Sequence, residues 1–229
     1  MASSHWWANF EIYQKYAIVV GVGAIASFTA YLAYLQKQKM DASNRDEGFV
    51  DLAKDEEPTE RKVLMLGLDG AGKSSLLQGL SSERGDNRQA PQATHGSNVL
   101  CLDKENPPLT IWEIGGAESM RKYWNNFVQD TCILLYVVDA CDELRLPESY
   151  LELHKLLGDD RLKGVPIIII ANKQDIEGAL SPLQAVHSMG LDNTSPNERK
   201  VLSIGTSAPP DAPFGGINDL KQLLIKLAS

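Results

Sequence analysis

The sequence predicts an α/β fold with a mostly parallel sheet over residues 61–229. Three continuous aliphatic runs are typical of strands covered by helices on both faces: KVLMLGL, TCILLYVVDA and VPIIIIAN. Amphipathic stretches such as ESYLELHKLLG lie between them, and the chain closes with the helix-like GINDLKQLLIKLAS. Strands that alternate with helices form parallel sheets with right-handed crossovers. We therefore expect helices on both faces of the sheet.

One pair of strands is expected to run antiparallel. The strand-like runs NVLCLD and LTIWEI are separated only by KENPP. A connection this short between two strand patterns is typical of a hairpin. The sequence therefore predicts one antiparallel hairpin at an edge of the sheet.

The segment before this domain predicts a membrane anchor over residues 1–36. Residues 16–36, YAIVVGVGAIASFTAYLAYLQ, carry no charge and are long enough, as a helix, to cross a hydrocarbon core of about 30 Å. Aromatic residues crowd both ends of this run, as they do at membrane interfaces. A core helix would normally show a polar face, and a signal peptide would begin with basic residues. We therefore expect a single transmembrane helix here.

Residues 37–60 predict a flexible linker. The segment turns acidic through DEGFVDLAKDEEPTE and has few large apolar residues, so it cannot bury enough surface to order itself. Lys37, Lys39 and Arg45 follow the predicted span, whereas only Lys15 precedes it. This bias places the C-terminal domain in the cytosol. The mildly hydrophobic span suits the mitochondrial outer membrane or an endomembrane.

Composition excludes some classes of protein. The formal net charge of the 229 residues is −8, which argues against a nucleic-acid partner because such proteins normally present a basic face. The three cysteines are widely spaced and form no CxxC pair. This pattern fits neither a disulfide framework nor a zinc site, so we expect reduced, mostly buried thiols.

The stretch GLDGAGKS, residues 67–74, predicts a phosphate-binding loop. It matches G-x-x-x-x-G-K-[ST] and lies between the strand-like KVLML and the helix-like SSLLQGL, as the motif requires. Gly67 and Gly72 permit a turn that aims backbone N–H groups at phosphate oxygens. Lys73 is expected to neutralise the β- and γ-phosphates, and Ser74 to place its hydroxyl on Mg²⁺. The nucleotide-binding residues predicted in this loop are Asp69, Gly70, Ala71, Gly72, Lys73, Ser74 and Ser75.

The stretch ANKQD predicts a guanine reader. It follows the buried run VPIIII and so lies at the carboxyl end of a strand, where ligands bind in open α/β sheets. A carboxylate at Asp175 can accept from guanine N1–H and from the exocyclic amine, and adenine offers neither donor in that arrangement. Asn172 is expected to brace the loop, and the stem of Lys173 to cover the base.

Together these motifs resemble the ADP-ribosylation-factor-like branch of small GTPases over residues 61–229. The resemblance is carried by GLDGAGKS, ATHGSNV, WEIGG, LLYVVDACDELRL, ANKQD and SIGTS. It implies a six-stranded P-loop GTPase fold, binding of Mg²⁺ with GTP or GDP, and effector proteins that read two nucleotide-sensitive switches. An exchange factor or a GTPase-activating protein is a further class of partner that it implies.

The resemblance also implies roles for residues outside the two main motifs. Thr94 would close on Mg²⁺ and the γ-phosphate, together with the Ser74 hydroxyl. Gly116 would offer its N–H to the γ-phosphate. Gly205 and Thr206, in the late loop, would lie behind the guanine.

Three positions differ from the residues usual in that family. Glu113 stands where an aspartate is usual, and we expect it to hold Mg²⁺ through water. Ser97 replaces a phenylalanine that helps to form effector-facing surface. Ala117 replaces the glutamine that orients the attacking water, so no catalytic residue is assigned. Glu118, His95 and Gln92 are alternative groups that could hold this water. We expect nucleotide binding with weak or absent intrinsic hydrolysis.

Three functions remain open at this point. The leading one is a membrane-anchored GTP/GDP switch that recruits effectors at a cytosol-facing membrane. The alternative is a constitutive membrane scaffold that uses bound guanine nucleotide for structure only. An ATP-dependent kinase or ATPase would use the same phosphate loop, but NKQD disfavours it.

Overall fold

A six-stranded sheet forms the centre of the domain. The computed structural model describes residues 60–81, 93–102, 105, 107–209 and 212–229. The strands follow the order β2-β3-β1-β4-β5-β6 across the sheet. Only β2 and β3 pair antiparallel, and the other neighbours are parallel, so the predicted edge hairpin and parallel sheet are confirmed. The strands are β1 (Arg61–Leu66), β2 (Ser97–Leu102), β3 (Leu109–Ile114), β4 (Thr131–Asp139), β5 (Ile167–Asn172) and β6 (Val201–Gly205).

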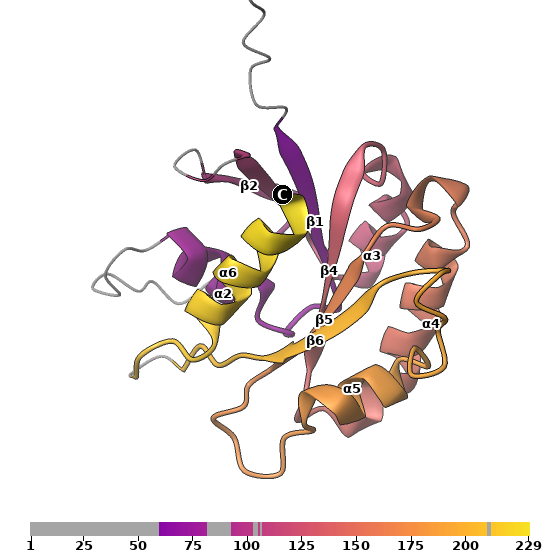
Figure 1. The fold of residues 1–229 in the computed structure, drawn as a ribbon. Coiled ribbons are helices and arrows are strands. Elements are labelled where there is room, and N and C mark those ends of the chain that lie inside the picture. Colours follow the sequence, from indigo (N-terminus) through magenta and orange to yellow (C-terminus); the bar gives the residue numbers. More distant parts are fainter. Residues whose placement is uncertain (1–59, 82–92, 103–104, 106, 210–211) are drawn as a thin grey trace, which may run out of the picture. The chain divides into compact units, whose positions relative to one another are not determined.

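Helices cover both faces of this sheet, as the alternating pattern predicts. Figure 1 shows α2 and α6 on one face and α3, α4 and α5 on the other. Three short 3-10 helices, η1 to η3, interrupt the connections. The bounds are α2 (Lys73–Ser81), α3 (Glu118–Arg121), η1 (Trp124–Asn126), η2 (Glu143–Arg145), α4 (Leu146–Leu157), η3 (Asp160–Leu162), α5 (Pro182–Ser188) and α6 (Ile217–Ala228).

The central strands supply two hydrophobic cores, one on each side. Successive side chains of a strand point to opposite faces, so Leu134 and Tyr136 pack in one core while Ile133 and Leu135 pack in the other. All six residues of β5 are buried. This explains why the aliphatic runs are continuous rather than alternating.

The parallel arrangement brings several loops to one edge of the sheet. β1, β3, β4, β5 and β6 run in one direction, so the loops that follow them emerge at their shared carboxyl ends. The loop after β1 passes close to β4, because a Cβ added at Gly67 would lie 2.2 Å from the Val137 carbonyl oxygen. Gly67 also has a φ of +144°, so the strand-like run KVLMLGL ends as a strand at Leu66.

The N-terminal predictions lie outside the described residues. These are the transmembrane helix within residues 1–36 and the linker over residues 37–60, of which only Glu60 is described. Among the residues that are described, no helix combines the length and apolar character needed for a membrane span.

The cysteines are free, as expected, but the expectation that they are mostly buried is wrong. Cys101 is exposed, and Cys132 and Cys141 are half-buried. Cys101 lies on β2, the outer strand of the hairpin, which has mostly exposed residues. A strand at the edge of a sheet is covered less completely than a central one, and the sequence pattern of a single cysteine does not report its position.

Candidate functional site

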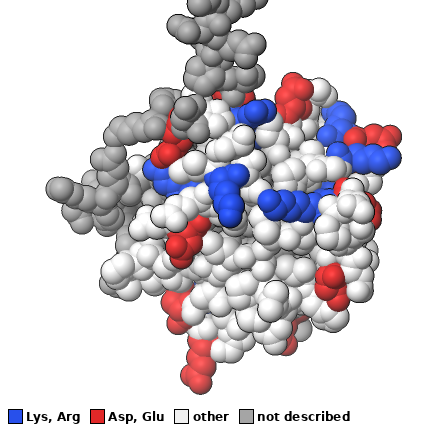
Figure 2. All heavy atoms as spheres, in the orientation of Figure 1, with Lys and Arg blue, Asp and Glu red and all other residues white. Residues whose placement is uncertain are grey.

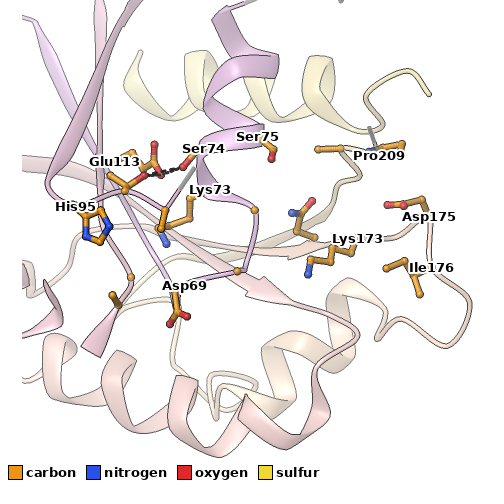
Figure 3. A pocket seen from close by; sticks show the side chains of 18 residues that line it. Asp69, Lys73, Ser74, Ser75, His95, Glu113, Lys173, Asp175, Ile176 and Pro209 are labelled. Carbon is orange, nitrogen blue, oxygen red and sulfur yellow. Dashed lines mark hydrogen bonds between the residues drawn. The ribbon is translucent and has the colours of Figure 1, made fainter. Parts of the chain in front are cut away.

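An open cavity of about 560 Å³ lies at the carboxyl ends of the strands. Its volume is in the range typical of small-molecule sites. Figure 3 shows Lys73, Ser74, Glu113 and His95 at one end of the cavity, and Lys173, Asp175, Ile176 and Pro209 at the other. The full lining is Asp69, Gly70, Gly72, Lys73, Ser74, Ser75, Ala93, Thr94, His95, Glu113, Gly116, Ala117, Asn172, Lys173, Asp175, Ile176, Ala208 and Pro209.

Lys73 begins α2 and is held beneath the phosphate loop. Its side chain is buried, and its Nζ donates to the carbonyl oxygens of Gly67 and Leu68, both at 2.9 Å. Burial lowers the pKa of Lys73 from 10.5 to about 8, and the carboxylates of Glu113 and Asp69 offset only part of this effect. An ammonium group that has lost much of its hydration is poised to interact strongly with an anion that enters the cavity.

Ser74 and Thr94 meet beside the carboxylate of Glu113. The Ser74 and Thr94 hydroxyl oxygens are 3.1 Å apart, although the residues are 20 positions apart in the chain. Ser74 donates to Glu113 Oε1 at 2.5 Å, and Thr94 lies 3.4 Å from the same oxygen. Asn98 donates to Glu113 Oε2 at 2.9 Å. Sequence reasoning missed Asn98, although antiparallel pairing places it directly opposite Glu113.

This oxygen cluster fits a magnesium ion that is shared with phosphates. Mg²⁺ prefers oxygen ligands and is usually bound by one or two carboxylates together with substrate phosphate oxygens and waters. The two hydroxyls and one carboxylate supply part of such a set. Among the described residues, no three His, Cys, Asp or Glu side chains gather into a metal cage. Ser74 and Thr94 are the residues that would hold such an ion, with Glu113 beside them to act through water.

Asn172 ties the two ends of the cavity together. It is buried at the end of β5, donates to the Ala71 carbonyl oxygen at 2.8 Å and accepts from the Thr206 hydroxyl at 2.9 Å. Asn172 therefore joins the end of β5 to the phosphate loop and to the late loop, and its role as a brace of the guanine-reading loop stays a prediction. A Cβ at Gly72 would lie 2.2 Å from the Asn172 amide nitrogen, and the φ of Gly72 is +88°, so a glycine is required there.

The far end of the cavity is formed by the loop after β5. Lys173 has a φ of +68°, and its Nζ pairs with Asp139 at 2.5 Å. Asp175 and Ile176 line the cavity beyond it. This ion pair forms because β4 and β5 are neighbours in the sheet, which brings Asp139 opposite Asn172 and so close to Lys173.

Gly205 and Thr206, which are predicted to lie behind the guanine, do not line the cavity. Thr206 is buried and contacts Asn172, and Gly205 ends β6 beside Gln174 and Pro182. The wall of the cavity at this end comes instead from Ala208 and Pro209. Ala71 is likewise buried in the phosphate loop, where its carbonyl accepts the bond from Asn172.

The loop after β3 presses against the phosphate loop. A Cβ at Gly116 would lie 2.3 Å from the Gly67 carbonyl oxygen and 2.4 Å from the Asp69 nitrogen, so only glycine allows this approach. Trp124 donates from Nε1 to the Gly115 carbonyl oxygen at 3.0 Å. Arg121 donates from Nε to the Gly116 carbonyl oxygen at 2.6 Å. The backbone that faces the cavity is thus fixed from behind.

Ala117 lines the cavity, and its methyl side chain has no polar atom that could hold water. Of the alternative groups considered for that task, exposed His95 also lines this cavity. Glu118 faces a separate hollow of about 320 Å³, formed with residues of η1 and α4. Gln92 lies outside the described residues. The geometry therefore leaves His95 as the described candidate.

Sequence reasoning missed a ring of four charged side chains that includes the cavity-lining Asp69 and three residues outside the lining. In this charged ring, Arg121 bonds Glu148 at 2.6 Å and Asp69 at 3.2 Å, while Arg145 bonds Asp69 at 2.7 Å and Glu148 at 3.1 Å. Burial would raise the pKa of Asp69, but hydrogen bonds from Arg145 and Arg121 outweigh it and lower that pKa. Hydrogen bonds from Arg121 and Arg145 likewise lower the pKa of Glu148. Both carboxylates therefore stay ionised at neutral pH.

Comparison with known proteins places these features in a family. A sequence model of the ADP-ribosylation factor family matches residues 50–214. The mouse ADP-ribosylation factor-like protein 10 is 40% identical over 177 residues, which are 76% of this chain and 71% of that protein. The human ADP-ribosylation factor-like protein 9 is 34% identical over 175 residues, covering 76% of this chain and 91% of that protein.

A solved structure shows the same architecture. The Arl6 BBS3 small GTPase from Trypanosoma brucei, with the bound nucleotide analogue GppNp, matches the chain with a TM-score of 0.62 at 26% identity. The match covers 74% of this chain and 98% of that one. The described sheet therefore has the fold of a small GTPase whose structure was solved with a nucleotide analogue bound.

Proposed function

Because the chain belongs to the ADP-ribosylation factor family of small GTPases, we propose that it is a membrane-anchored GTP/GDP switch with weak intrinsic hydrolysis. The observation that carries the nucleotide part is the cavity itself. A buried lysine stands under its phosphate loop, and Asp175 lies at its opposite end, with Asn172 bonded to the loops at both ends. Guanine specificity follows from a carboxylate that accepts from guanine donors that adenine lacks.

The terminal phosphate would be read by two backbone regions that meet beside Lys73. Thr94 already lies against Ser74 and Glu113, and Gly116 lies against the start of the phosphate loop. A bound Mg²⁺ would neutralise phosphate charge between the two hydroxyls. Loss of the γ-phosphate would remove the ligand that Thr94 and Gly116 share, which is how switch segments are released in such proteins.

Weak hydrolysis follows from Ala117. Phosphoryl transfer in this class depends on positioning and charge stabilisation, and a relative with a glutamine turns over at only about 3–5 × 10⁻⁴ s⁻¹ unaided. Removal of one orienting donor costs about 10²–10³ in comparable sites. The bound triphosphate should therefore persist unless a partner protein supplies the missing group.

The switch proposal is tested by its partners in the two nucleotide states. Protein loaded with GDP or with a non-hydrolysable GTP analogue should capture different cytosolic proteins, because a switch requires partners with differential affinity for its two states. Ser97, exposed at the start of β2, belongs to the surface that would choose them. An identical partner set in both states would instead support the constitutive scaffold.

The membrane part of the proposal rests on the uncharged run at residues 16–36. A helix of that length can cross a bilayer, and residues 37–60 would then tether the cytosolic GTPase domain to the mitochondrial outer membrane or an endomembrane. Carbonate extraction of membranes should leave the full chain in the pellet and release a variant without residues 1–36. Release of both proteins would contradict the anchor.

A further inference from the structure

Arg121 holds two residues of the cavity wall, Asp69 and Gly116, although it does not itself line the cavity. Its side chain is only 6% exposed. It donates to the Gly116 carbonyl oxygen at 2.6 Å, to Glu148 at 2.6 Å and to Asp69 at 3.2 Å. A buried arginine with three such partners is fixed in position, because its planar guanidinium presents donors in a rigid fork.

We propose that Arg121 is a positioning residue that sets the preference of this site for a nucleoside triphosphate over a diphosphate. This inference rests on the proposed nucleotide-binding function and names the residue that makes the site sensitive to the terminal phosphate. Arg121 would act through the backbone and not by contact with the nucleotide.

The geometry of the peptide bond explains how Arg121 sets the direction of N–H groups in the loop after β3. In a trans peptide, the C=O and the following N–H point in opposite directions. The bond from Arg121 to the Gly116 carbonyl therefore fixes the direction of the Ala117 N–H, and the bond from Trp124 to the Gly115 carbonyl fixes the Gly116 N–H. Gly116 and Ala117 both line the cavity. Two preset donors cost no reorganisation when an anion arrives.

The charged ring holds Arg121 in this position. Asp69 belongs to the phosphate loop, while Arg145 and Glu148 belong to η2 and α4. Arg145 also donates to the backbone oxygen of Asp69 at 3.0 Å. The ring therefore joins the phosphate loop, the end of α3, η2 and the start of α4, and its two positive and two negative charges balance. Two of its four bonds pass through Arg121.

The location of these donors explains selectivity for the triphosphate. Gly116 packs against Gly67, Leu68 and Asp69 at the start of the phosphate loop. In Figure 3, Asp175 and Lys173 lie at the opposite end of the cavity from Lys73 and Glu113. A base bound at that far end leaves only the terminal phosphate near Gly116. A diphosphate would bind without these two donors.

The test compares the affinities of GDP and the non-hydrolysable analogue GppNHp for the full-length protein in magnesium buffer. Arg121→Ala should weaken GppNHp binding about tenfold or more, as expected for loss of a preset donor to a charged phosphate, and leave GDP binding unchanged within about twofold. Arg121→Lys should be intermediate, because lysine keeps the charge without the fork. Arg161→Ala is the matched control, since Arg161 also pairs with an aspartate and donates to a carbonyl, that of Asn125.

A purely structural role would have a different signature. Arg121→Ala would then weaken the binding of both nucleotides equally and lower the melting temperature. Either that outcome or an unchanged GppNHp affinity would overturn the proposal. Glu148→Gln provides a second variant that keeps Arg121 in place and weakens its support, so it should shift the ratio in the same direction by less. If the wild-type protein binds neither nucleotide, the proposed function itself fails. If the wild-type protein binds both nucleotides and neither variant changes the ratio of GppNHp affinity to GDP affinity, only the proposed role of Arg121 is contradicted.

Discussion

At the scale of single residues, Lys73 links stability and nucleotide affinity to pH. Its pKa is about 8 in the folded protein, against an ordinary value of 10.5. Between these values the unfolded chain keeps a proton that the folded protein has released, so this lysine makes stability rise with pH in that window. Below pH 8 Lys73 is protonated in both the folded and the unfolded protein, so burial of its charge lowers the free energy of unfolding by the full amount. Phosphate binding favours the charged form, so nucleotide affinity should fall above pH 8.

These opposite trends can be measured together. Chemical denaturation of nucleotide-stripped protein from pH 7 to 10.5 should show the rise, and GDP titrations over the same range should show weakening affinity. Lys73→Met should lose the stability trend, whereas Lys155→Met, at an exposed lysine of α4, should retain it. A GDP affinity that is constant up to pH 10 would contradict the assignment of Lys73.

Ala117 is the residue at which hydrolysis should be recoverable. Ala117→Gln is expected to raise single-turnover GTP hydrolysis by about 10²-fold, because it restores a group that can orient water next to an intact phosphate cradle. His95→Ala is the comparison variant, since His95 lines the same cavity. A substantial basal rate that His95→Ala abolishes would mean that the imidazole already holds the water. That result would contradict the proposal that Ala117 makes hydrolysis weak.

At the scale of elements, Asn172 joins the phosphate loop, the end of β5 and the late loop after β6. Asn172→Ala removes its bonds to Ala71 and Thr206 and leaves two buried polar groups without partners. Each such group costs about 1–3 kcal/mol, so the free energy of unfolding should fall by about 2–6 kcal/mol. Urea denaturation measures this, with exposed Asn193→Ala as the control. A loss equal to that of the control would mean that the brace is dispensable.

Some elements are predictable from the sequence because their signal is local. The three aliphatic runs correspond to β1, β4 and β5, and the short KENPP connection predicts the β2–β3 hairpin. The phosphate loop and the guanine reader are contiguous motifs. By contrast, α3 and the 3-10 helices have three or four residues, too few to show a helical period.

The charged ring illustrates what a local pattern cannot show. Arg121 lies 52 residues from Asp69 and 27 from Glu148, while Arg145 lies 76 residues from Asp69. Only the order of strands across the sheet brings these positions together. Each residue alone is indistinguishable from a solvated surface charge. Asn98 is the nearest to a predictable case, because a hairpin register would pair it with Glu113.

At the scale of the whole molecule, the GTPase unit has a complete sheet and two cores of its own. Residues 56–229 cluster as one compact unit. On the face that Figure 2 shows, positive side chains gather in the upper half, and acidic ones are spread among and below them. The net charge of −8 is the basis of the prediction that nucleic acid is not the partner, and that prediction stays untested.

The central claim is that one cavity captures guanosine phosphates through a phosphate loop at one end and Asp175 at the other. Isothermal titration of the full-length protein with GDP and with ADP in magnesium buffer tests it most directly. We expect saturable binding of GDP, at least about 100-fold weaker binding of ADP, and loss of that discrimination in Asp175→Asn but not in the nearby exposed Glu177→Gln. Equal affinities for GDP and ADP, or no heat with either, would contradict the claim.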